Sequence, residues 1–375
     1  MSKSIKMIDL QAEYQHFQPQ LEKKIINVLA EGKYIKGKEV QEFENQLAEY
    51  LKVKQVISCG NGTDALQIAL MALGIGIGDE VIIPAFAYVA VIEVICLLGA
   101  IPVMVDIEPD HFQIDFNAIE KAITPKTKAI IPVHLFGQCG AMAEILTLAK
   151  KHHLFVIEDN AQALGSKVKT SQKEMFTGTI GDIGCTSFFP TKNLACFGDG
   201  GALMCNDETL AQKIRMVANH GQVQKYEHEC VGVNSRLDTL QAAILNFKLP
   251  YLEESINKKR ILAEIYRQEL KSVSKIKLPE EKRDNWHTWH QFTLQIKDNS
   301  RDHLKKHLAQ NGVDSMIYYP KALYQQKAYT DFKVFCQNTE RICDSVLSLP
   351  IHVRLEKEEV LSICNLIKEF YDARA

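Results

Sequence analysis

The sequence predicts an α/β protein in which helices cover both faces of a mostly parallel sheet, followed by a smaller α+β domain. Between residues 56 and 157, short apolar segments alternate with segments of helical periodicity. The short segments are apolar throughout, which is typical of parallel strands buried on both faces. The pattern changes after residue 250, so we expect a large domain at residues 1–250 and a small one at residues 251–375.

The elements of the large domain are expected in a regular order. Two helices within residues 21–51 are separated by Gly32 and Gly37, and a strand at 56–58 leads through a glycine turn into a helix at 65–73. Strands and helices then alternate. We expect strands at 80–83, 101–105, 129–133, 154–157 and 202–205, and helices at 88–98, 116–123, 141–151 and 210–217.

The remaining chain is expected to be more helical. Residues 181–202 are interpreted as a glycine-bracketed loop without helix or strand, and residues 220–233 as a polar, mobile loop. An amphipathic helix at 237–252 closes the large domain. The small domain is expected to contain helices at 253–270, 301–310 and 357–371 and a strand at 291–296.

The composition is that of an ordinary globular protein and argues against several function classes. The net charge of -2 over 375 residues, with 24% charged residues, predicts no surface for nucleic acid or anionic membrane. The first residues lack the apolar core of a signal peptide, and the apolar stretch 85–105 contains Glu93, Gly99 and Pro102. We therefore expect a cytoplasmic protein without a membrane span.

The sequence does not favour a metal site. The ten cysteines are scattered without a CxxC pair, which predicts neither disulfides nor a zinc site. His287 and His290 could present two ligands on one helical face, but no further ligand cluster lies nearby in the sequence. We interpret these histidines as part of a surface or interface aromatic cluster.

Polar residues gather where the predicted strands end. In an open parallel sheet, ligands bind beyond the carboxyl ends of the strands, and residues 60–64, 86–88, 134–138 and 158–162 occupy such positions. The turn at 60–64 could offer free N–H groups at a helix start to a phosphate. Alternatively, Gly62 only permits the turn while Thr63 or Asp64 caps the helix, and the pattern alone leaves both interpretations open.

A lysine and an aspartate turn this edge of the sheet into a candidate cofactor site. Lys192 lies in the glycine-rich stretch 181–202, where glycines and Pro190 can hold an amine in one place. Asp159 ends a buried strand and could alone be a helix cap, a metal ligand or a salt-bridge partner. An amine, an acid and an anion cradle together are what pyridoxal phosphate requires.

Each group has a separate task in that chemistry. Lys192 would form the Schiff base with the aldehyde, and Asp159 would pair with the pyridinium nitrogen so that the ring accepts electrons. Gln162 could donate a hydrogen bond to the phenolic oxygen of the ring. Tyr88 could cover the ring face, although an ordinary core aromatic is an equally good interpretation of this residue.

Four motifs carry a resemblance to a known family. They are GNGTDAL at 60–66, EDNAQALG at 158–165, GCTSFFPTKNLACFGDGGA at 184–202 and GVNSRLDTLQAAIL at 232–245. Together they resemble the DegT/DnrJ/StrS nucleotide-sugar aminotransferases, whose fold is of the aspartate-aminotransferase type (fold type I). The similarity runs from about residue 8 to the C-terminal helix.

The resemblance implies roles for individual residues. It makes Lys192 the Schiff-base lysine and Asp159 the partner of the pyridine nitrogen, with Gln162 on the ring oxygen and Tyr88 stacked on the ring. Three further residues, Gly62, Thr63 and Ser187, would bind the phosphate. Asn234 matches an asparagine that reaches the phosphate from the neighbouring subunit, which implies a homodimer with shared active sites.

The resemblance also implies which substrates take part in the reaction and which residue transfers the proton. It implies glutamate as amino donor, a keto-sugar nucleotide as acceptor and Lys192 as proton shuttle, since a desolvated amine can act near neutral pH. Relatives that act as dehydratases carry histidine in place of this lysine, so dehydration is not expected. A pyridoxal-phosphate-binding sensor or scaffold without turnover is the alternative from another function class.

The sequences of these motifs are most similar to those of enzymes that aminate C3 of UDP-linked 3-oxo-N-acetylglucuronate in lipopolysaccharide pathways. Arg236 could then meet the sugar carboxylate, although a structural salt bridge is the more usual role. Tyr318 and Tyr319 are candidate substrate contacts, and Tyr318 replaces the histidine of a His-Tyr-Pro triplet. Leu164 replaces another family histidine. C3 or C4 amination of a UDP- or dTDP-linked keto-deoxysugar remains the alternative.

Overall fold

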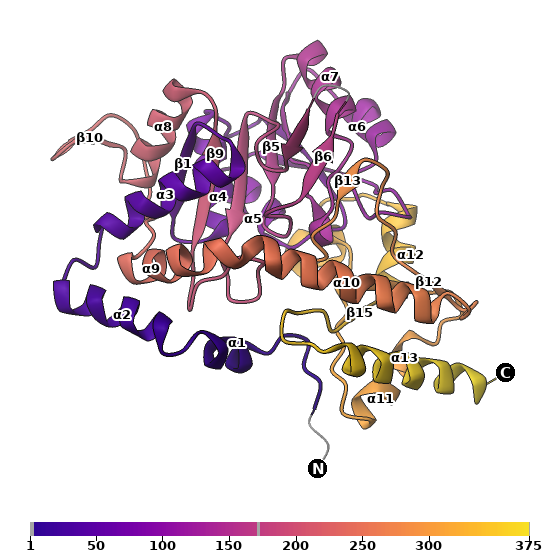
Figure 1. The fold of residues 1–375 in the computed structure, drawn as a ribbon. Coiled ribbons are helices and arrows are strands. Elements are labelled where there is room, and N and C mark those ends of the chain that lie inside the picture. Colours follow the sequence, from indigo (N-terminus) through magenta and orange to yellow (C-terminus); the bar gives the residue numbers. More distant parts are fainter. Residues whose placement is uncertain (1–3, 171–172, 375) are drawn as a thin grey trace.

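The computed structural model describes residues 4–170 and 173–374, and a seven-stranded sheet forms its centre (Figure 1). The strand order is β1-β9-β8-β5-β4-β2-β3. The neighbours from β3 to β8 are parallel, and only β9 runs antiparallel to the strands beside it. The predicted mostly parallel sheet is therefore confirmed. Its strands are β1 (Gln55–Cys59), β2 (Glu80–Pro84), β3 (Ile101–Val105), β4 (Thr127–Ile130), β5 (Phe155–Asp159), β8 (Ile183–Ser187) and β9 (Gly201–Cys205).

Helices cover both faces of this sheet because the strands are apolar on both sides. Ile83 packs into a core with α4 and α5, whereas the preceding Ile82 packs into a separate core with α6 and α7. Successive strand residues point to opposite faces, so adjacent isoleucines serve both layers. The covering helices are α4 (Gly62–Ala72), α5 (Ala90–Leu97), α6 (Phe116–Ala122), α7 (Met142–His152) and α8 (Glu208–Ala218).

The prediction of a loop without strands at 181–202 was wrong. Residues Ile183–Ser187 form β8, and β9 begins at Gly201. Gly184 and Gly201 resemble loop residues in the sequence, but they serve close packing, because a Cβ at Gly184 would collide with the carbonyl of Gly178 and one at Gly201 with the carbonyl of Asn61. The irregular part that carries Lys192 is limited to residues 188–200.

Two other predicted segments also differ from the structure. The polar stretch 220–233 contains a hairpin, β10 (Gln222–Gln224) and β11 (Glu227–His228), that projects from the body (Figure 1). The helix predicted at 237–252 ends earlier, as α9 (Thr239–Lys248), and a 3₁₀ turn at Leu249–Tyr251 leads into α10 (Leu252–Leu270). Pro250 explains the break, since proline cannot donate the helical hydrogen bond.

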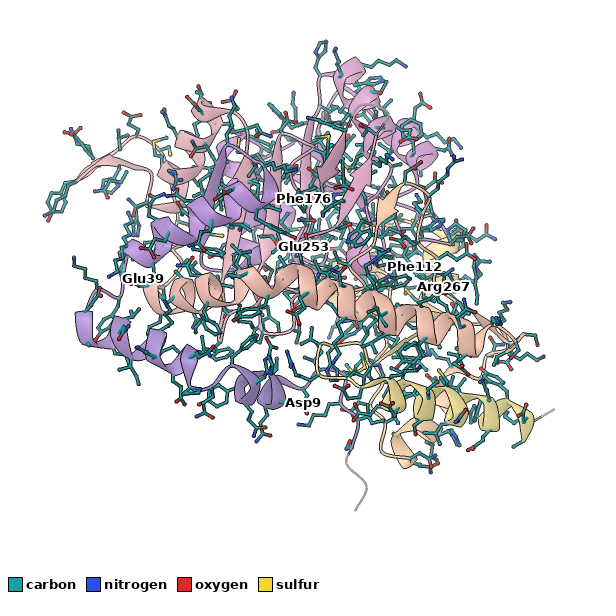
Figure 2. The ribbon with its side chains drawn as sticks, viewed as in Figure 1. Asp9, Glu39, Phe112, Phe176, Glu253 and Arg267 are labelled. Atoms are coloured by element: carbon teal, nitrogen blue, oxygen red, sulfur yellow. The ribbon has the colours of Figure 1, made fainter. Side chains whose placement is uncertain are left out.

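Of the N-terminal helices, the first two lie along the lower side of the molecule in Figure 1, and the third lies higher, next to the large sheet. The two predicted helices are α2 (Gln20–Glu31) and α3 (Lys38–Leu51), and the sequence interpretation missed α1 (Leu10–Phe17). Asp9, labelled in Figure 2, caps α1 by accepting a hydrogen bond from the Ala12 N–H (3.1 Å). Glu253, also labelled, ties α10 to α3 by accepting from the Tyr50 hydroxyl (2.7 Å).

The C-terminal part forms a second core around its own sheet. Strands β12 (Ile276–Lys277), β14 (Phe292–Ile296) and β15 (Val346–Leu349) pack with α10, α11 (Arg301–Gln310) and α13 (Lys357–Asp372). Residues 322–324 and α12 (Gln337–Ser345), however, return to the core of the large sheet. The domain boundary at residue 250 stays a prediction.

The remaining elements are short. They are β6 (Lys167–Lys169), β7 (Glu174–Phe176) and β13 (Asn285–Trp286), which form one small sheet, and the 3₁₀ turns Leu135–Gly137, Leu323–Gln325 and Lys327–Tyr329. Within residues 4–170 and 173–374, no helix has the length and apolar character needed to cross a bilayer.

Candidate active site

The sheet brings Asp159 and Ser187 to the same edge. They are the last residues of β5 and β8, which are parallel neighbours in the sheet. The N-terminus of α4 meets the same edge, because a Cβ added to Gly62 would lie 2.7 Å from the Ser187 Cβ and 3.3 Å from its Oγ. Residues that are far apart in the sequence therefore surround one point beyond the strand ends.

Asp159 is a buried carboxylate. Its side chain is 8% exposed, and its Oδ1 accepts a hydrogen bond from the Ala161 N–H (3.0 Å). Burial raises the pKa of Asp159, while the Ala161 N–H and the nearby Lys192 and His134 oppose that rise. Among the described residues, no cationic side chain forms an ion pair with this carboxylate. A protonated ring nitrogen would therefore find an unpaired acidic partner here.

Lys192 follows β8 in the irregular segment 188–200. Its backbone N–H donates to the Phe189 carbonyl (2.9 Å), which closes a tight turn around Pro190. Burial lowers the pKa of the Lys192 amine to about 8, although the negative charge of Asp159 favours the ammonium form. An amine with this pKa is partly neutral near physiological pH and can act as a nucleophile.

The turn before α4 forms an anion cradle. The helix is capped by Asn61, whose Oδ1 accepts from the Asp64 N–H (2.8 Å), so the alternative in which Thr63 or Asp64 caps it was wrong. The cap leaves the first N–H groups of the helix, at Gly62 and Thr63, directed out of its end. A glycine is required at position 62 because any larger residue would displace Ser187.

Ser235, which the sequence interpretation did not single out, holds this turn in place. Its hydroxyl accepts from the Gly60 N–H (2.8 Å) and donates to Asp64 Oδ2 (2.6 Å). It is the middle residue of the Asn234-Ser-Arg236 segment, in which only the outer two residues were assigned roles. Its function depends on two contacts with residues more than 170 positions away, so no local pattern indicates it.

The side chains of Gln162 and Tyr319 form a hydrogen bond with each other. Gln162 Oε1 accepts from the Phe136 N–H (2.9 Å), which directs its Nε2 toward the Tyr319 hydroxyl (2.9 Å). Tyr319 is delivered by the C-terminal part of the chain, and burial raises the pKa of its hydroxyl. The structure thus places a predicted substrate residue beside a predicted cofactor residue.

Tyr88 lies at the rim of the same site. Its ring is tilted against that of Tyr319 at a centroid distance of 6.2 Å, whereas Tyr319 contacts Phe86 and Tyr318 edge-on, at 5.8 and 5.9 Å. Tyr88 is 58% exposed, so the interpretation as an ordinary core aromatic was wrong. An exposed aromatic ring can stack on a planar group, and the predicted stacking role of Tyr88 stays a prediction.

Asn234 and Arg236 flank Ser235, which contacts the turn at Gly60. Asn234 is exposed and pairs with Asn219 through an isolated backbone bridge. Arg236 is partly buried, and within the described part of the chain its guanidinium makes no hydrogen bond or ion pair, in contrast to the structural salt bridge considered above. Their roles toward a second subunit and a substrate stay predictions, as does the role of the half-buried Tyr318.

Glu158, the second acidic residue of β5, stabilises the segment 178–181 next to this strand. Glu158 is fully buried and accepts from the His134 ring (2.8 Å) and from the N–H groups of Gly178, Ile180 and Gly181 (2.7–2.8 Å). The Gly140 N–H donates to His134 Nδ1 (3.2 Å), which leaves Nε2 to donate to Glu158. The carboxylates of adjacent strand residues therefore point to opposite faces and serve different purposes.

Residues 287–290 were interpreted as a surface or interface aromatic cluster, and the surface alternative was wrong. His287 and His290 are both buried, and burial together with neighbouring cations, Arg260 beside His287 and Lys192 beside His290, lowers their pKa well below the usual value. The His287 ring stacks on Trp289 with centroids 4.0 Å apart. The segment passes close to Gly137, whose carbonyl accepts from the Thr288 N–H (2.9 Å), so it forms part of the wall of the site.

The geometry fits the comparisons with known proteins. The profile of the DegT/DnrJ/EryC1/StrS aminotransferase family matches residues 16–368. The chain belongs to this family. The predicted resemblance is confirmed, and the protein is a pyridoxal-phosphate-dependent aminotransferase.

Three curated relatives span almost the whole chain. A UDP-2-acetamido-2-deoxy-3-oxo-D-glucuronate aminotransferase from Pseudomonas aeruginosa is 44% identical over 96% of this chain and 98% of its own length. A pleiotropic regulatory protein from Geobacillus stearothermophilus is 40% identical (98% and 99%). A UDP-N-acetyl-3-dehydro-alpha-D-glucosamine 3-aminotransferase from Acidithiobacillus ferrooxidans is also 40% identical (97% of each chain).

Solved structures agree with the fold. The crystal structure of DesV from S. venezuelae in complex with a ketimine intermediate has a TM-score of 0.94, 37% identity and coverage of 98% of this chain and 99% of that one. A Bacillus subtilis structure described with bound cofactor PMP has a TM-score of 0.88 and 33% identity, covering 98% of this chain and 86% of that one. The predicted fold type and cofactor are both confirmed.

Proposed function

We propose that the protein transfers an amino group from glutamate to a keto-sugar nucleotide, at C3 of a UDP-linked 3-oxo-N-acetylhexuronate. The observation that carries the proposal is the meeting of a partly buried amine, a buried unpaired carboxylate and a helix N-terminus at one edge of the sheet. The choice of sugar is supported by the relative that acts on UDP-2-acetamido-2-deoxy-3-oxo-D-glucuronate. The product would serve lipopolysaccharide or another surface polysaccharide.

The donor set fits pyridoxal phosphate, which when bound supplies an electron-withdrawing ring that stabilises negative charge at the carbon next to the transferred nitrogen. Asp159 would hold the protonated ring nitrogen, because a buried carboxylate favours a cationic partner. The first N–H groups of α4, at Gly62 and Thr63, would bind the phosphate together with the Ser187 hydroxyl. Gln162 would donate its Nε2–H to the phenolic oxygen.

Lys192 would have two tasks in turn. Its neutral amine would carry the cofactor covalently, and after release the same amine would move a proton between the two carbon atoms that flank the transferred nitrogen. Burial favours both tasks, because it lowers the pKa of the amine to about 8 and keeps a useful fraction unprotonated. Tyr88 would cover one face of the planar group and limit the access of water to it.

The substrate side of the proposal depends on Arg236. A guanidinium without a protein partner in the described part of the chain is suited to bidentate pairing with the carboxylate of a uronate. Tyr318 and Tyr319 would contact the sugar from the C-terminal part. A UDP- or dTDP-linked keto-deoxysugar, aminated at C3 or C4, is the alternative substrate and would not need this guanidinium.

The proposal includes a homodimer and a cytoplasmic location. Asn234 would reach the phosphate of the neighbouring subunit, since it is exposed on its own subunit beside the cradle. All ten cysteines are free, and nine of them are at least partly buried, which is typical of a reducing compartment. Reduction with borohydride followed by peptide mapping tests the site, because it should label Lys192.

A second candidate is a cofactor-binding regulator without turnover, supported by the relative named as a pleiotropic regulatory protein. Adding glutamate to the purified, cofactor-loaded protein separates the two functions. An aminotransferase should lose the visible absorption of the lysine-bound cofactor within minutes, whereas a sensor should retain it. A panel of UDP- and dTDP-linked keto-sugars, offered to the aminated protein, would then identify the acceptor.

A further inference from the structure

We propose that Lys259 is a positioning residue that acts on Lys192 through Asn193. Lys259 lies on α10, and its side chain reaches the segment 188–200 at Asn193. The inference rests on the proposed function, in which Lys192 carries the cofactor. It assigns a role to a residue that no sequence motif indicated.

Two hydrogen bonds make Asn193 a link between three parts of the chain. Lys259 Nζ donates to Asn193 Oδ1, and Asn193 Nδ2 donates to the Leu164 carbonyl (3.2 Å). Leu164 belongs to the turn that follows Asp159 and Gln162. The amide of Asn193 therefore connects α10 to both segments that carry cofactor residues, at the position next to Lys192.

This link restrains the amine in a segment that otherwise lacks regular structure. Residues 188–200 contain no helix or strand, so their position depends on individual contacts. When the backbone of a lysine rotates, the amine at the end of its side chain moves farther than the backbone does. Loss of the Asn193 contact should therefore shift Lys192 relative to Asp159 and to the cradle at Gly62.

Burial explains why a lysine at position 259 needs this contact. Lys259 is 6% exposed, and burial lowers the pKa of its amine to about 8, opposed by the charge of Glu13. An amine removed from water is stabilised by hydrogen bonds to polar groups, and the Asn193 oxygen provides one. Lys259 and Lys192 both lower the pKa of His290, so these three basic groups form one cluster.

Lys248 offers a matched control. It is equally buried (7% exposed), lies on the adjacent helix α9 and contacts the same segment, donating to the Ala195 carbonyl (3.0 Å). It also forms an ion pair with Glu13 (2.6 Å). Its contact is to the backbone three residues beyond Lys192, so replacing it should weaken the fold without displacing the Asn193 amide.

The experiment compares Lys259→Met, Asn193→Ala, their double variant and Lys248→Met. Protein freed of cofactor is mixed with pyridoxal phosphate, and borohydride reduction at timed intervals followed by peptide mapping gives the rate of attachment at Lys192. Lys259→Met and Asn193→Ala should each slow attachment by about tenfold, as expected for a displaced amine. The double variant should be no slower than the single ones, since both remove one link. Lys259→Arg, which keeps a donor, should recover most of the rate.

Lys248→Met should lower the melting temperature while leaving the attachment rate within about twofold of wild type. The pH dependence of the visible absorption provides a second signal, which should move in Lys259→Met and not in Lys248→Met. Wild-type rates and an unmoved pH profile in a folded Lys259→Met, or additive effects in the double variant, would overturn the inference. Wild-type labelling at a lysine other than Lys192 would instead overturn the proposed function.

Discussion

The cofactor side and the substrate side of the site are built in different ways. On the cofactor side, Asp159 and Gln162 are held by hydrogen bonds, and Gly62 is packed against Ser187. On the substrate side, Arg236 is partly buried and has no partner among the described residues. The difference indicates that the cofactor groups of this chain are preorganised by contacts within the chain, whereas the substrate side presents a guanidinium that is available for a ligand.

The largest effect is expected at Lys192, the residue to which the cofactor should attach. Lys192→Ala should abolish covalent capture of the cofactor and reduce transamination by about 10³-fold or more, because the variant lacks the amine that forms the covalent bond. Mass spectrometry of borohydride-treated protein checks the result. A labelled peptide that retains wild-type yield in the variant would contradict the assignment.

The two neighbouring carboxylates of β5 should behave differently. Asp159→Asn removes the charge that faces the cofactor and should lower kcat by about 10²-fold with little loss of stability. Glu158→Gln leaves N–H groups of residues 178–181 with a weaker acceptor and should lower the free energy of unfolding by about 2 kcal/mol. Steady-state kinetics and urea unfolding of both variants test this. Similar kinetic losses in the two would argue against separate roles.

Attachment of the cofactor should depend on pH through Lys192. Because burial lowers the pKa of the amine to about 8, its neutral fraction falls about tenfold for each pH unit below that value. The attachment rate in cofactor-free protein should therefore rise up to about pH 8 and level off above it. Stopped-flow absorbance measures this rate, and a rise that continues to pH 10 would show an ordinary lysine.

The lowered pKa of Lys192 should also make the free energy of unfolding depend on pH. The unfolded chain binds a proton at Lys192 up to the ordinary pKa of 10.5, whereas the folded chain releases it near 8. The free energy of unfolding should therefore gain a contribution as pH rises from about 8 to 10.5, and this contribution should be absent from Lys192→Met. Comparing the two proteins cancels the parallel contribution of Lys259.

Replacing Arg236 tests the proposed contact with the substrate. Arg236→Ala should raise KM for an acidic sugar nucleotide by about tenfold while changing the free energy of unfolding little, because no ion pair within the described chain is lost. The half-reaction with glutamate should proceed as before. Unchanged turnover of the acidic substrate would remove Arg236 from the site and favour a neutral deoxysugar.

The smallest effect is expected where the two sides meet. Tyr319→Phe removes the hydroxyl that accepts from Gln162 Nε2 but keeps the ring, so kcat should fall by only about threefold. The absorption maximum of the bound cofactor should shift, since Gln162 is then free to turn. A loss as large as that in Asp159→Asn would instead make Tyr319 part of the cofactor side.

Much of the fold and of the cofactor side was predictable because the signals are local. Uniformly apolar strands between periodic helices indicate a parallel sheet, and each strand end indicates where ligands bind. Lys192, Asp159 and Gly62 stand out within a few residues of such ends. The error at 181–202 arose because glycine is typical of loops, whereas Gly184 and Gly201 lie in strands that another backbone approaches closely.

The sequence by itself determined most of the order of elements, the family and the candidate residues for the chemistry, because these depend on periodicity and on motifs of a few positions. Only the tertiary structure decided which distant groups meet: Tyr319 with Gln162, Lys259 with Asn193, and Ser235 with the turn at Gly60. Burial of His287 and His290 was decided there too. Such contacts depend on packing between elements, and packing leaves no periodic pattern in either partner.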